Sequence, residues 1–186
     1  MFPYFKIIKL SNLEKLQQSL TEMIPTHLYN KLGIWLDDNQ EAFLNNNYLI
    51  SALTEVGIDI NEVSVRWYIM NPYYIGAIHT DTGIHDYSFN IPVINCDNTF
   101  TKFYSYDPEK PPKLIGRKSP GTNLRAFYED YSKSNCKIET EFQSNVPAVI
   151  TTRIPHNVIN PNDSYRVNLL IREDKNVQLK KLFTTA

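Results

Sequence analysis

Four side chains in this 186-residue sequence have types and spacings that could support metal chemistry: His79, Asp81, His156 and Arg166. His79 and Asp81 stand two residues apart, so on an extended chain an imidazole and a carboxylate point to the same side and can bind one cation. Taken alone, a His-x-Asp pair is better explained as a hydrogen-bonded turn. With His156 the set becomes two histidines and one carboxylate, the facial triad that suits non-haem Fe(II) and leaves three coordination positions open.

Arg166 adds an anion-binding group to this set. His156 follows an extended segment that turns at Pro155, and residues 160–164 (NPNDS) form a strong turn signal before the chain returns through Arg166. We therefore expect His156 and Arg166 on adjacent antiparallel strands. A guanidinium at this place offers a planar fork of donors that matches a carboxylate.

The elements that must position these residues change character along the chain. The first sixty residues have helical periodicity. Ser11 and Glu14 have the spacing of a capping box, Leu13 to Ile24 carry apolar residues at helical intervals, and a second helix is expected from Asp37 to about Gly57, with residues 45–47 (NNN) as a possible break.

From residue 62 the apolar period changes from helical to alternating. Strands are predicted at 63–69, 87–93, 100–106, 136–142, 146–152 and 166–172, and residues 107–122, rich in Pro, Gly and Lys, are expected to form a long loop, which could serve as a lid. We predict one domain over 1–186, a mainly β fold with N-terminal helices: a helical layer over 1–60 and a double-stranded β-helix barrel over 61–175.

Three of these strands have one apolar face and one polar face. The polar positions are Arg66 and Tyr68, Ser88 and Asn90, and Arg166 and Asn168. They could simply meet water, as in most antiparallel sheets. Alternatively, the helices cover the apolar faces, Trp67 included, and the polar faces line a barrel interior where a polar ligand could bind.

The ordered set His79-x-Asp81, His156 and Arg166 resembles the Fe(II)/2-oxoglutarate-dependent dioxygenase superfamily. Residues 66–83, 87–95 and 145–172 are most similar to its aspartyl/asparaginyl β-hydroxylase-like branch, and the likeness covers about residues 62–106 and 145–172. The resemblance implies that His79, Asp81 and His156 bind iron and that Arg166 binds the distal carboxylate of 2-oxoglutarate.

The same resemblance implies further site residues and a reaction. Tyr68 would support that carboxylate through its hydroxyl, and Ser88 and Asn90 fall where the branch places polar contacts to the keto-acid end, often Arg and His in its members. Some members lack the carboxylate ligand, whereas Asp81 completes the triad here. The implied activity is hydroxylation of an amino-acid, peptidyl or other small polar substrate, using Fe(II), 2-oxoglutarate and O₂ and releasing succinate and CO₂.

Composition limits the other function classes. Nineteen basic residues against twenty acidic ones give a net charge of −1, without the basic stripe that nucleic-acid binding requires. No apolar run reaches the length of a membrane span. Two cysteines match neither a disulfide framework nor a zinc site, so we expect a cytoplasmic protein with no nucleic-acid or membrane partner.

Two other functions remain open from the sequence. One is a cupin-like metalloenzyme that does not use 2-oxoglutarate, which would not need Arg166 in the barrel. The other is a non-catalytic binding module in which His79 and His156 are unrelated. His85, six residues after His79, is expected to be a histidine in a surface turn, with a hydrogen bond to the site as its less favoured role.

Overall fold

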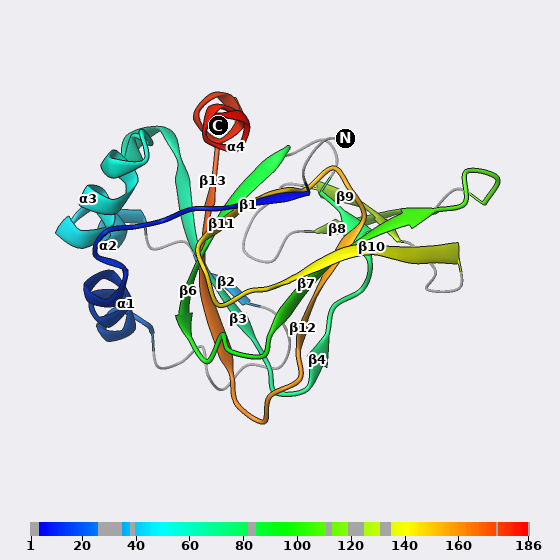
Figure 1. Ribbon diagram of the computed structural model, residues 1–186, viewed down its shortest axis with the longest axis horizontal. Helices are drawn as coiled ribbons and strands as arrows, with labels where there is room; N and C mark the ends of the chain where they lie inside the picture. Colours follow the sequence, from blue (N-terminus) through cyan, green and yellow to red (C-terminus); the bar gives the residue numbers. More distant parts are fainter. Residues whose placement is uncertain are drawn as a thin grey trace.

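Two antiparallel sheets face each other in the computed structural model, and three helices cover the outer side of one of them (Figure 1). The structure describes residues 4–25, 35–37, 40–81, 85–110, 113–118, 125–130, 135–173 and 175–185, and of 35–37, 113–118 and 125–130 it describes the backbone. The fold is mainly β with a few helices, a double-stranded β-helix, as the sequence predicts.

The first sheet carries the strands that alternate most regularly. Its order is β1 (Phe5–Ile7), β11 (Ala148–Thr151), β6 (Tyr87–Ile94), β13 (Arg166–Arg172), β3 (Ser64–Met70) and β2 (Trp35–Asp37). β13 lies between β6 and β3, with Asn168 opposite Tyr68 and Arg172 opposite Ser64. A strand near the C-terminal end of the sequence thus lies between two strands from its middle part, and β1 lies at one edge.

The second sheet carries the two histidines. Its order is β10 (Cys136–Gln143), β7 (Phe100–Tyr106), β12 (His156–Asn160), β5 (His79–Thr80), β9 (Arg125–Asp130) and β8 (Lys113–Lys118), and β4 (Tyr74–Ile75) also pairs with β12. His156 and Arg166 therefore lie in opposite sheets, and the prediction of adjacent strands is wrong. The turn at 161–165 carries the chain from one sheet to the other instead of closing a hairpin.

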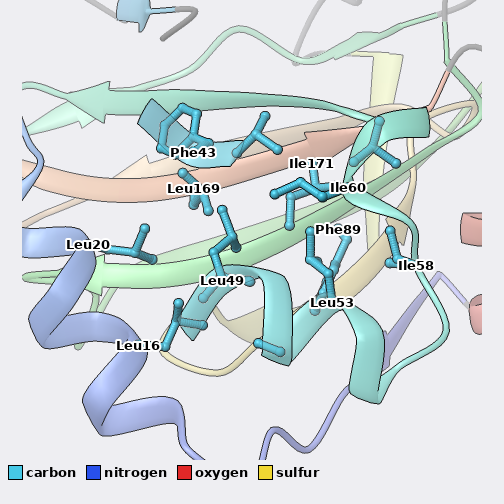
Figure 2. Close-up of a cluster of buried hydrophobic side chains, with 14 of the residues drawn as sticks. Leu16, Leu20, Phe43, Leu49, Leu53, Ile58, Ile60, Phe89, Leu169 and Ile171 are labelled. Carbon is cyan, nitrogen blue, oxygen red and sulfur yellow. The ribbon is translucent and has the colours of Figure 1, made fainter. Parts of the chain in front are cut away.

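The main hydrophobic core fills the space between the first sheet and the helices α1 (Leu13–Glu22), α2 (Gln40–Leu44) and α3 (Asn47–Glu55) (Figure 2). A short 3₁₀ turn, Ile60–Glu62, leads into β3. The apolar face of the sheet is Val65, Trp67, Ile69, Phe89, Ile91, Val167, Leu169 and Ile171, all buried. The helices thus cover this face, which leaves the alternate polar positions for the barrel interior.

Local details of the helices differ from the prediction. Ser11 does not cap α1: its backbone N–H and hydroxyl bond the carboxylate of Glu55, and the residue at the N-cap position, Asn12, makes no capping bond through its side chain. The second helical segment begins at Gln40, because Asp37 belongs to β2, and it divides in two at Asn46. The asparagine run therefore does break the helix.

Two further differences concern chain segments rather than caps. The predicted loop at 107–122 contains β8, which forms a hairpin with β9, so there the Pro- and Gly-rich composition misled the prediction. Of the rest of that stretch, residues 111–112 and 119–122 lie outside the described residues. A fourth helix, α4 (Val177–Thr184), was not predicted; Leu179 and Phe183 bury its apolar side in the main core.

Asn46 is expected to be the most sensitive helix cap. Its side-chain oxygen accepts from the Leu49 backbone N–H at 2.9 Å, and its amide donates to Ser19 Oγ at 2.8 Å. Asn46→Ala should lower the free energy of unfolding by about 1–2 kcal/mol, because the N-cap bond is lost. Urea unfolding should show this loss, whereas Asn45→Ala, at an exposed neighbour bonded to the Glu41 carbonyl, should change stability far less. Equal losses in the two variants would contradict the assignment of the cap.

Among the residues that the structure describes, no helix has the length and apolarity needed to cross a membrane.

Candidate metal centre

The two histidines are brought together by strand pairing. His79 on β5 and His156 on β12 are directly opposite partners in the register, and their ring centroids lie 4.6 Å apart. Asp81 follows β5, and its backbone N–H donates to the Thr152 carbonyl at 3.0 Å. This hydrogen bond holds Asp81 next to the segment that leads into β12. Asp81 and His156, 75 positions apart in the sequence, thus lie at the same end of the barrel.

Both imidazole rings are oriented in the same way. His79 Nδ1 lies 2.9 Å from the Ala77 carbonyl oxygen, and His156 Nδ1 lies 2.8 Å from that of Ile154. A carbonyl can only accept, so each Nδ1 carries a proton, and in the neutral form of each ring the lone pair available to a metal is on Nε2. One potential ligand atom from each of His79, Asp81 and His156 falls within a group no wider than 4.8 Å. This is the donor set and spacing that a divalent cation needs.

Asp81 is held as a buried carboxylate. Its side chain is 4% exposed; Oδ2 accepts from Arg172 Nη2 at 2.8 Å, and Oδ1 lies 3.6 Å from His79 Nε2. Burial alone would raise the pKa of Asp81, but the Arg172 guanidinium and the neighbouring histidines outweigh it and hold this pKa below its ordinary value. The carboxylate is therefore ionised at neutral pH, as metal binding requires.

His156 is likewise kept in the form that binds metal. Burial lowers its pKa to about 4; the nearby His79 acts in the same direction and Asp81 opposes it. The imidazole is therefore neutral throughout the physiological range, and its Nε2 does not need to lose a proton before it binds a cation.

The same pKa predicts acid sensitivity of the metal-free protein. Between pH 6.5 and about 4 the unfolded chain binds a proton at His156 that the folded chain does not, so stability falls as the pH falls through this window. Urea unfolding in the presence of a chelator should show wild type losing about 2 kcal/mol more than His156→Asn between pH 7 and pH 5. An equal loss in both proteins would contradict this assignment.

Arg166 lies fully inside the barrel, with 2% of its surface exposed. Its Nη1 contacts Met70 Sδ at 3.2 Å, a weak acceptor, and its Nε is buried without a hydrogen-bond partner. Within the described part of the chain, no acidic group forms an ion pair with it. A buried charge without a counterion is costly, so this guanidinium is suited to bind an anion that enters the barrel.

Tyr68 connects the two regions of the interior. It is partly buried and lies opposite Asn168, two positions along β13 from Arg166, and removal from water raises the pKa of its hydroxyl. The charges of Arg166, Asp81 and Arg172 all act on that hydroxyl. Tyr68 is therefore placed between the arginine and the metal-ligand candidates, and its neutral hydroxyl can donate a hydrogen bond to a ligand that spans them.

Ser88 and Asn90 project from β6 on the same polar face. Ser88 Oγ is buried and has no hydrogen-bond partner among the described residues, whereas the Asn90 amide donates to the Ser88 carbonyl at 3.2 Å. Ser88 thus has an uncommitted hydroxyl, and Asn90 is partly used within its own strand.

Two residues near the centre have surroundings that the sequence did not indicate. His85 is buried, not in a surface turn, and its Nδ1 lies 3.4 Å from the Glu173 carbonyl oxygen. Arg172, which holds Asp81, is not among the candidate site residues that the sequence indicates. One signal did exist for Arg172: it has the same parity as Arg166 on β13, so both had to face the barrel interior.

A cavity of about 520 Å³ lies where β3 begins and β13 ends. Ser64, one of its lining residues, is opposite Arg172 in the strand register. The three metal-ligand candidates are not among its lining residues. The charged residues that line the cavity are Glu62, Arg66, Glu173 and Lys175. A space of this size and polarity can hold a small polar molecule.

Comparison with known proteins supports the architecture. No protein-family model matches the sequence, and no curated protein matches it. The solved structure of EvdO2 from Micromonospora carbonacea var. aurantiaca complexed with 2-oxoglutarate is similar, with a TM-score of 0.51 and 12% identity over 91% of this chain and 86% of that one. A second EvdO2 structure gives the same TM-score at 13% identity, over 92% and 87%. The chain therefore has the same fold as EvdO2. At 12% and 13% identity, this likeness concerns the fold alone.

Proposed function

We propose that this protein is a non-haem Fe(II)- and 2-oxoglutarate-dependent dioxygenase that hydroxylates an amino-acid, peptidyl or other small polar substrate. One observation carries the proposal: a facial set of two imidazoles and a carboxylate shares the barrel interior with Arg166, a buried guanidinium without an acidic partner among the described residues. A metal site without a keto acid has no need of that buried cation.

The three ligand candidates suit Fe(II). His79 and His156 would bind it through Nε2 and Asp81 through one carboxylate oxygen, a set of three protein ligands. When bound, iron together with the keto acid supplies the oxidising power that inserts one atom of O₂ into a C–H bond, while the other atom enters succinate. The chain holds the ligands in place and keeps water from the buried Asp81 and His156.

Arg166 and Tyr68 provide the features expected of a dicarboxylate site. The guanidinium of Arg166 would pair with the distal carboxylate, and the Tyr68 hydroxyl would donate a second hydrogen bond to it. Bound 2-oxoglutarate in EvdO2, a protein of the same fold, supports this choice of cosubstrate. Ser88 Oγ, buried and uncommitted, is available to the same ligand.

The cavity beside Arg172 supports a polar main substrate. It has charged lining residues of both signs, among them Glu62, Arg66 and Lys175, and Val63 is its one hydrophobic lining residue among those that the structure describes. A zwitterionic or amide-bearing group is matched by such a lining better than a hydrocarbon is. Its lining residue Ser64 is opposite Arg172, the last residue of β13, whereas Arg166 is the first, so substrate and cosubstrate would approach the metal from different sides.

Succinate release tests the proposal. Wild-type protein, Fe(II), ascorbate and 2-oxoglutarate are incubated with a panel of free amino acids, peptides and proteins. We expect succinate in metal-dependent turnover, stimulated by the true substrate and absent from His79→Ala. Metal binding without succinate under any condition would favour a metalloenzyme that does not use 2-oxoglutarate. Absence of both would favour a non-catalytic module.

A further inference from the structure

Arg172 forms an ion pair with Asp81, one of the three metal-ligand candidates. Its Nη2 donates to Asp81 Oδ2 at 2.8 Å, and its side chain is 15% exposed. The two residues come from opposite sides of the barrel: Arg172 ends β13 in the first sheet, and Asp81 follows β5 in the second. The contact therefore crosses the interior at the proposed metal centre.

The two oxygens of Asp81 have different surroundings. Oδ2 is occupied by the Arg172 guanidinium, whereas Oδ1 faces His79 Nε2 at 3.6 Å, on the side where the ligand atoms converge. A carboxylate with both oxygens free can bind a cation through both. Here one oxygen is already engaged, and the other is directed toward the histidines.

We propose that Arg172 is a positioning residue that holds Asp81 so that it binds the metal through Oδ1 alone. This inference rests on the proposed metal centre and adds a residue that the sequence motif does not contain. A bidentate Asp81 would occupy one of the three positions that keto acid and oxygen need. By engaging Oδ2, Arg172 keeps that position open and fixes the direction of the Oδ1 lone pair.

A second arginine–aspartate pair in the chain, Arg153 and Asp86, is much more exposed than the pair of Arg172 and Asp81. Arg153 Nε lies 2.6 Å from Asp86 Oδ1, but the Arg153 side chain is 68% exposed, whereas that of Arg172 is 15% exposed. Exposed pairs contribute little to stability, and Arg153→Gln is therefore a matched control. In the barrel, loss of Arg172 would leave Oδ2 of the buried Asp81 carboxylate without the guanidinium that holds it, and the carboxylate could then turn toward the metal with both oxygens.

The test is a calorimetric titration with Ni(II), which binds imidazole sites more tightly than Fe(II) and is not oxidised in air. Arg172→Gln should weaken Ni(II) binding by roughly 10- to 100-fold, the usual effect of losing an outer partner of a metal ligand. Arg172→Lys, which keeps the charge and provides a second chance of a folded variant, should lose less. Arg153→Gln should bind like wild type.

A double-mutant cycle separates positioning from a structural role. If Arg172 acts through Asp81, Arg172→Gln should cause no further loss of Ni(II) affinity in an Asp81→Ala background. The visible absorption of bound Co(II), which follows the number and geometry of its ligands, should change in Arg172→Gln and not in Arg153→Gln. Unchanged or tighter Ni(II) binding by Arg172→Gln, or an equal loss in the Asp81→Ala background, would overturn the inference.

These outcomes are distinct from failure of the proposed function. Ni(II) binding requires neither 2-oxoglutarate nor turnover, so the role of Arg172 can hold in a metalloprotein with another reaction. If His156→Ala bound Ni(II) like wild type, the metal centre itself would be wrong, and the role of Arg172 would fall with it.

Discussion

His156→Ala is expected to lose metal binding and turnover together. The substitution removes one of three ligands, and loss of a mere outer partner already weakens metal affinity by about 10- to 100-fold, so we expect a loss above that range and no detectable succinate. His79→Ala should behave in the same way, because His79 and His156 are opposite each other on paired strands and each has a ligand atom in the same candidate metal site. Isothermal titration and succinate release measure the two effects.

Folding provides the control for this pair of variants. The main core lies between the first sheet and the helices, away from both histidines, so neither variant should lose its fold. With a chelator present, each should unfold in one cooperative transition near that of wild type. Added metal should raise the melting temperature of wild type and of neither variant, because only a bound ligand stabilises the folded state. Full activity in either variant would falsify the triad.

Arg166→Ala is expected to raise the 2-oxoglutarate requirement by roughly tenfold to a few hundredfold. A hydrogen bond to a charged group contributes about 1.5–3 kcal/mol, an unpaired buried carboxylate adds to the loss, and each 1.4 kcal/mol is a factor of ten. Arg166→Lys should recover only part, since an ammonium lacks the bidentate fork. Cosubstrate titration at fixed metal measures the change, and metal affinity itself should stay near wild type.

Replacing Arg166 should weaken cosubstrate binding but not the stability of the ligand-free protein. Because the Arg166 guanidinium is buried against the weak acceptor Met70 Sδ and has no ion pair with a described acidic residue, Arg166→Met should leave the ligand-free protein as stable as wild type or more so. 2-Oxoglutarate should then stabilise wild type and not the variant. A large loss of stability in Arg166→Met, or identical cosubstrate curves for wild type and Arg166→Ala, would remove Arg166 from the pocket and favour a metalloenzyme without a keto acid.

Alternation and motif spacing together predicted most of the barrel. Strands at 100–106 and 166–172 match β7 and β13 residue for residue, and the polar face of Tyr68 and Asn168 does turn inward. The period-two pattern carries this information because one face of each strand must pack on helices while the other cannot. The helices on the apolar side were evident for the same reason.

What the sequence could not reveal were the long-range pairings. Nothing local distinguishes a hairpin turn at 161–165 from a crossing to the other sheet, so His156 and Arg166 were expected on neighbouring strands. The contact between Arg172 and Asp81 joins residues 91 positions apart, and only the closed barrel brings them together. His85 was expected in a surface turn, whereas it is buried with its Nδ1 3.4 Å from the carbonyl oxygen of Glu173, 88 positions away in the sequence.

An anaerobic titration of the Fe(II)-loaded protein with 2-oxoglutarate tests the central claim most directly. A keto acid that chelates Fe(II) through its carboxylate and keto oxygens produces a visible charge-transfer band without any turnover or substrate. We expect a saturable band in wild type, its displacement to higher 2-oxoglutarate in Arg166→Ala, and its absence in His156→Ala. Wild-type protein that binds Fe(II) at this centre but develops no band at any 2-oxoglutarate concentration would contradict the claim that metal and keto acid share this barrel.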